Sequence, residues 1–126
     1  MILLFWIFFI ATGFIIRILT NLTHNPRKYP YTKNLTGYLR KLTKKEIHHI
    51  HLGFLLFLIT LLLILISGFN KINIILGAIS LSLIADQIIP YLNSLINYFE
   101  KKGIISSILA HVIIGIIVTL VLYLIN

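Results

Sequence analysis

Five side chains within or beside apolar stretches of the sequence could bind a divalent metal ion: His48, His49, His51, Asp86 and His111. Imidazole and carboxylate groups are ligands of zinc, iron and manganese, and the spacing of His48 and His51 can place both rings on one metal. The chain has no cysteine, so thiolate ligands and disulfides are excluded. The sequence therefore predicts a site for zinc, iron or manganese built from these histidines and the aspartate.

The rotation of the helix that carries three of these histidines decides which of them can join such a site. His49 shares a stripe with Gly53 and Thr60, whereas His48 and His51 project from the opposite side. Either His49 alone faces the rest of the protein, or the pair does. The sequence leaves both rotations open.

Two other interpretations of the same residues also stay open. Asp86 can form a structural ion pair with Arg17, because both are predicted near the same end of their apolar stretches and a charge in hydrocarbon needs a partner. Alternatively, the histidines and Asp86 could carry protons in a proton-coupled transporter. No nucleophile is evident, so the sequence does not decide whether the protein is an enzyme.

The chain that positions these groups has the composition of an integral membrane protein. Of its 126 residues, 59% are hydrophobic and 11% are charged, and the mean hydropathy is +1.01. Four apolar stretches, about 2–22, 44–67, 72–89 and 103–125, can cross roughly 30 Å of hydrocarbon at about 1.5 Å per helical residue. We therefore expect an all-α protein with four transmembrane helices in a single membrane domain.

The boundaries and connections of these stretches carry further signals. Thr43 and Glu46 fit a capping box that starts the second helix at Lys44, and Pro90 is expected to end the third. Within the basic segment 23–43, apolar residues recur at helical spacing over 35–42, and they do so again over 91–102. One or two short amphipathic helices at the membrane surface are therefore expected.

Small and polar residues recur every fourth position in two of the predicted helices. Ser107, His111, Gly115 and Thr119 form one such stripe. A second stripe runs over 78–86 and ends at Asp86. Because small side chains let neighbouring helices approach closely, both stripes are predicted to face the interior of the bundle.

The distribution of positive charge predicts the orientation of the chain. Lysine and arginine outnumber acidic residues 11 to 3, and ten of the eleven lie in or beside the first and third connections, against Lys71 on the other side. The positive-inside rule therefore predicts a cell-membrane protein with cytoplasmic first and third connections and both termini outside. The expected partners are the bilayer, anionic lipid headgroups at the basic loop, and a homo-oligomer or larger membrane complex. Nucleic acid is not expected, since the charges flank apolar stretches.

Residues 48–53 have the sequence His-His-Ile-His-Leu-Gly, and Ala85, Asp86 and Gln87 follow one helix later. This pattern resembles that of small uncharacterised prokaryotic multi-pass membrane proteins with a His-His-x-His-x-Gly helix start. The resemblance covers the second and third apolar stretches. It implies a multi-pass membrane fold and no particular activity.

Overall fold

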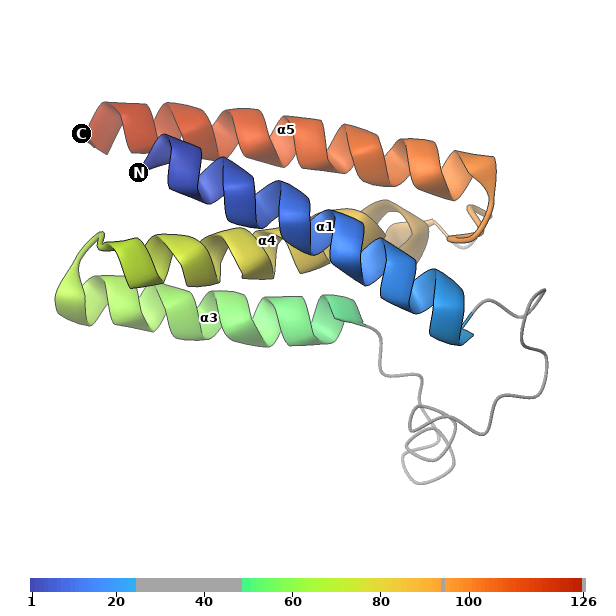
Figure 1. Ribbon diagram of the computed structural model, residues 1–126, viewed down its shortest axis with the longest axis horizontal. Helices are drawn as coiled ribbons and strands as arrows, with labels where there is room; N and C mark the ends of the chain where they lie inside the picture. Colours follow the sequence, from blue (N-terminus) through green and yellow to red (C-terminus); the bar gives the residue numbers. More distant parts are fainter. Residues whose placement is uncertain (25–48, 94, 126) are drawn as a thin grey trace, which may run out of the picture.

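The computed structural model describes residues 1–24, 49–93 and 95–125, and these residues form four helices and no strand. The helices are α1 (Ile2–His24), α3 (His49–Ser67), α4 (Lys71–Leu92) and α5 (Lys101–Ile125) (Figure 1). All four are long and apolar enough to cross a membrane. The expected all-helical architecture with four candidate spans is confirmed at this level.

Helix α4 is the central element of the bundle. It packs against α1, α3 and α5, and α1 also contacts α5. Ten of the 22 residues of α4 are buried, and α1, α3 and α5 each bury a smaller share of their residues. Helix α4 can occupy the centre because it carries small buried residues, such as Ala78, Ser82 and Ala85, at helical spacing.

The two ends of the bundle differ in what they hold. Helix α1 begins and α5 ends at the same end of the bundle as the turn that joins α3 to α4 (Figure 1). In that turn Gly68 has φ +70°, a conformation that favours glycine. The Asn70 side chain then caps α4 by accepting a hydrogen bond from the Asn73 amide at 3.0 Å. The connection between α4 and α5 lies at the opposite end.

That second connection differs from the sequence expectation. Helix α4 continues through Pro90 to Leu92, so the proline, which lacks a backbone donor and crowds the preceding turn, does not end the helix. Between Leu92 and Lys101 the described residues form turns instead of an amphipathic helix. The Asn93 and Asn97 side chains accept hydrogen bonds from backbone amides two residues later, at 3.1 and 3.0 Å, and such turns compete with helix formation. The predicted amphipathic helix at 35–42 and the capping box at 43–46 lie outside the described residues.

Candidate functional site

A buried carboxylate connects all four helices near the end that holds the α4–α5 connection. The Asp86 side chain is 1% exposed. Its Oδ1 accepts hydrogen bonds from Arg17 Nη1 of α1 at 3.2 Å and from Ser107 Oγ of α5 at 2.7 Å. Its Oδ2 accepts from His49 Nε2 of α3 at 3.1 Å and from the Tyr98 hydroxyl in the connection. We call these five residues the Asp86 cluster.

The donors of the cluster also contact one another. Arg17 Nη2 donates to the Tyr98 carbonyl oxygen at 3.1 Å, and the guanidinium carbon lies 4.0 Å from the centre of the Tyr98 ring. The His49 and Tyr98 rings meet edge to face, with centroids 5.8 Å apart. Every buried side-chain nitrogen and oxygen in the described part of the chain has a hydrogen-bond partner. The buried polar atoms of the cluster are therefore all hydrogen-bonded, as a stable buried polar network requires.

The Tyr98 phenol is held in its protonated form. Burial raises the pKa of Tyr98 above its usual range, and the negative charge of Asp86 and the hydrogen bond between them raise this pKa further. Tyr98 therefore remains a hydrogen-bond donor to the carboxylate at any physiological pH.

The rotation of α3 follows from the close approach of its backbone to α4. A Cβ atom on Gly53 would lie 3.0 Å from the Ser80 carbonyl oxygen, so only a residue without a side chain fits well there. His49 stands one turn before Gly53 on the same face and so reaches Asp86. His51 is exposed, and its ring contacts that of Tyr91 with centroids 5.6 Å apart. Of the two rotations left open by the sequence, the structure has the one with His49 inward.

His111 lies on α5 one turn after Ser107 and belongs to a second group of polar contacts. Its Nδ1 is 2.8 Å from the Ser107 carbonyl oxygen, to which it must donate. Its Nε2 is 3.1 Å from Ser82 Oγ, which in turn lies 2.7 Å from the Phe9 carbonyl oxygen. Gly13 of α1 makes room for the imidazole, because a Cβ there would lie 2.5 Å from Nε2.

The hydrogen inventory of this second group allows two states of His111. If the single Ser82 hydrogen bonds the Phe9 carbonyl, then His111 Nε2 must donate, and the ring carries two hydrogens and a positive charge. If the ring is neutral, the Ser82 hydroxyl turns toward Nε2 and releases the carbonyl. Rotation of one hydroxyl therefore accommodates both the neutral and the charged imidazole.

The predicted metal ligands do not gather into one site in the described residues. His49 contacts Asp86, whereas His111 bonds serines instead, and His51 faces away. Within residues 1–24, 49–93 and 95–125, no group of three or more histidine, aspartate or glutamate side chains is arranged to hold a metal ion. His48 lies outside the described residues, so the metal site stays a prediction.

Sequence reasoning did not identify Tyr98 or the bond from Ser107 to Asp86. Ser107 belongs to a stripe that is predicted to face inward. The spacing of that stripe does not indicate which residue of another helix Ser107 contacts. Tyr98 lies in a connection whose course is set by asparagine turns, and no periodic pattern marks it. No protein-family model, no curated protein and no solved structure matches this chain.

Proposed function

We propose that this chain is a multi-pass membrane protein that serves as a non-enzymatic structural or accessory subunit, with its four helices joined by the Asp86 cluster. The observation that carries the proposal is the complete satisfaction of Asp86 by donors from three other helices and one connection. A carboxylate that already accepts four hydrogen bonds is poorly placed to bind a substrate or remove a proton. It is well placed to fix the positions of helices in hydrocarbon.

The exposed surface supports placement in a bilayer. Large apolar side chains cover the outer faces of α1, α3 and α5, and Leu65, Ile66 and Leu124 are each more than 80% exposed. A water-soluble protein rarely leaves such a continuous apolar surface uncovered. Acyl chains or the helices of a partner protein would cover it.

A serine and a histidine at hydrogen-bonding distance could suggest nucleophilic catalysis, but their surroundings argue against it. Ser82 Oγ lies 3.1 Å from His111 Nε2. The serine, however, is fully buried, and its hydroxyl also contacts the Phe9 backbone. A substrate carbonyl could not reach this hydroxyl without separating α1 from α4, so the structural role fits the geometry better.

The orientation is part of the proposal and has a direct test. The Asp86 cluster lies near the bundle end where α5 begins with Lys101 and Lys102. These two positive charges support a cytoplasmic location for that end. Because the chain has no cysteine, Lys33→Cys and Asn70→Cys each introduce a single thiol. In intact cells an impermeant maleimide should label the Asn70 variant only. Labelling of the Lys33 variant alone would mean that the topology is inverted.

The accessory role has its own test in native membranes. After mild solubilisation, blue native electrophoresis should show the chain in an assembly larger than its own mass. Asp86→Leu should remove it from that assembly, whereas Tyr123→Phe, at an exposed position of α5, should not. Migration of the wild-type chain as a monomer would contradict the accessory role and leave the membrane placement untouched.

One observation favours proton-coupled transport as a second candidate. Polar contacts lead from His49 to Asp86 and Ser107, and from the Ser107 carbonyl to His111 and Ser82. His111 can adopt a neutral or a charged state there by rotation of a single hydroxyl. Proteoliposomes that contain a pH-sensitive dye would test this candidate. Proton flux in the wild type that is lost in His111→Phe would support it, whereas wild-type flux no greater than that of empty vesicles would exclude it.

A further inference from the structure

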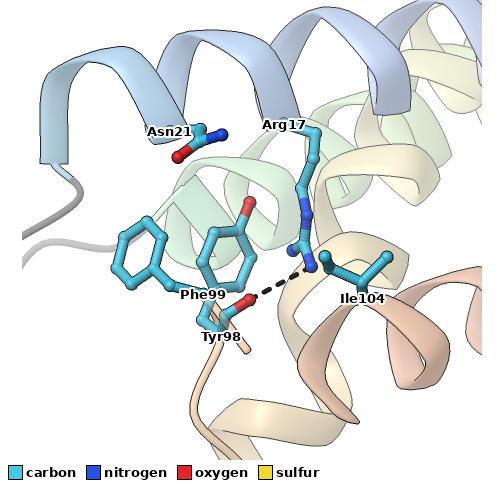
Figure 2. Close-up of a pocket in the computed structure, with 5 residues that line it drawn as sticks. All are labelled: Arg17, Asn21, Tyr98, Phe99 and Ile104. Atoms are coloured by element: carbon cyan, nitrogen blue, oxygen red, sulfur yellow. Dashed lines mark hydrogen bonds between the residues drawn. The ribbon is translucent and has the colours of Figure 1, made fainter. Parts of the chain in front are cut away.

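A small open pocket lies beside the Asp86 cluster, where α1, the α4–α5 connection and the first turn of α5 meet. It is lined by Arg17, Asn21, Tyr98, Phe99 and Ile104 (Figure 2). The Arg17 guanidinium and the Asn21 amide supply the polar part of the lining. The Phe99 and Ile104 side chains supply an apolar part. The pocket therefore combines hydrogen-bond donors with a hydrocarbon surface.

Arg17 has donors beyond those that the cluster uses. A guanidinium carries five N–H groups, and in the described residues Arg17 bonds Asp86 through Nη1 and the Tyr98 carbonyl through Nη2. Its side chain is 22% exposed, so the cluster does not enclose it. The Tyr98 ring, whose centre lies 4.0 Å from the guanidinium carbon, packs against the guanidinium and restricts its movement. An arginine held in this way is preorganised for a bidentate contact with an oxyanion.

Asn21 adds a second donor on the same side of α1. It stands four residues after Arg17, so the two side chains share one face of the helix. Figure 2 shows both side chains at the pocket, with the amide of Asn21 above the Tyr98 and Phe99 rings. Donors from two successive turns can contact two different oxygens of a tetrahedral anion.

The charges around the pocket are compatible with an anion. Asp86 balances Arg17, and Tyr98 adds no negative charge because it keeps its proton. Lys101 and Lys102 begin α5 directly after the exposed Glu100, which leaves one net positive charge in this segment. A singly charged phosphodiester is a better match to this balance than a multiply charged ion.

We propose that this pocket binds a phosphate group, with Arg17 and Asn21 contacting its oxygens and Phe99 and Ile104 contacting the carbon chain esterified to it. A membrane phospholipid combines both parts, and the pocket lies at the helix ends, where headgroups are found if the chain spans the bilayer as proposed above. A soluble phosphate ester is the other source of the same chemistry. The polar and apolar halves of the lining favour the phospholipid.

Thermal unfolding of the full-length protein in a non-ionic detergent tests this proposal with three probes. Dioleoyl phosphatidylglycerol should raise the Tm by on the order of 3 °C when it saturates the site. Dioleoylglycerol, which has the same acyl chains and no phosphate, should not. Inorganic phosphate, compared with chloride at equal ionic strength, is the third probe. A shift with phosphate alone as large as that with the lipid would identify a soluble phosphate as the source.

Matched variants assign the effect to the pocket. Asn21→Leu removes a donor and Ile104→Phe fills the cavity, so each should reduce the lipid-induced shift by more than half. Thr20→Leu changes the neighbouring residue of α1, which does not line the pocket, and should retain the full shift. Equal shifts with dioleoylglycerol and phosphatidylglycerol, or unchanged shifts in both pocket variants, would overturn the proposal. The assay does not depend on orientation in a membrane, so its failure is distinguishable from an inverted or absent topology.

Discussion

The Trp6 indole of α1 occupies the space that a side chain on Gly115 of α5 would fill. An ideal Cβ on Gly115 would overlap the six-membered ring of Trp6. One turn later, the indole Nε1 donates a hydrogen bond to Thr119 Oγ1 at 2.9 Å. The missing side chain and the hydroxyl together fix how α1 packs on α5.

We therefore predict that Gly115→Ala destabilises the protein, because the added methyl group must displace the tryptophan ring. A loss of about 1 to 3 kcal/mol in the free energy of unfolding is expected from such overpacking. Unfolding in mixed micelles with increasing denaturant measures it. Gly77→Ala is the matched control, since its new Cβ would meet Thr60 Cγ2 at an ordinary 3.6 Å. Equal effects of the two substitutions would contradict the proposed α1–α5 contact.

The ion pair between Arg17 and Asp86 predicts non-additive mutations. An unpaired charge in hydrocarbon costs on the order of 3 kcal/mol. Arg17→Leu leaves Asp86 without its ion-pair partner, and Asp86→Leu does the same to Arg17, so each should lower the free energy of unfolding by about that amount. The double variant should lose less than the sum, because it leaves no unpaired charge. Additive losses in the same unfolding assay would show that the two charges are independent.

Several features of this site could be predicted from sequence because they rest on helical periodicity. Ser107 and Gly115 of one stripe are buried, and so are Ala78, Ser82 and Asp86 of the other. Periodicity alone left α3 with two equivalent rotations. The close contact of Gly53 with the α4 backbone selects between them, and that contact depends on both helices at once. Tyr98 was not predictable for a related reason, since a connection between helices has no repeat to read.

His49 and His51 offer a test of the rotation of α3 and of the predicted metal site. His49→Ala removes a donor to the buried carboxylate and should lower the free energy of unfolding by about 1 to 3 kcal/mol. His51→Ala changes an exposed side chain and should alter it little. The reverse order would mean that α3 is rotated relative to this structure.

The metal content of the same purified variants tests the histidines as ligands. If divalent metal is bound through the inward face of α3, His49→Ala and His111→Ala should lose it, whereas His24→Ala should retain it. Loss in His51→Ala alone would instead support the other rotation. A wild-type protein without metal, and with no gain in Tm on addition of zinc, would leave the structural interpretation of these histidines.

The raised pKa of Tyr98 predicts a loss of stability in alkaline solution. Its ordinary pKa is 10.0, which applies to the unfolded chain, and burial together with Asp86 raises the value in the folded protein. Below about pH 10 both states hold the phenolic proton, so this residue gives no slope there. Above that pH the unfolded chain releases the proton while the folded protein keeps it. The free energy of unfolding should then fall by up to about 1.4 kcal/mol per pH unit.

Unfolding of the wild type and of Tyr98→Phe, measured between neutral and strongly alkaline pH, isolates this effect. The variant loses the hydrogen bond to Asp86 and should be less stable at neutral pH, but it should lack the alkaline slope that Tyr98 contributes. Tyr123→Phe, at an exposed position on α5, should keep the wild-type slope and corrects for the titration of lysines. An alkaline slope in Tyr98→Phe as steep as in the wild type would show that the phenol is not held by Asp86 in the folded protein.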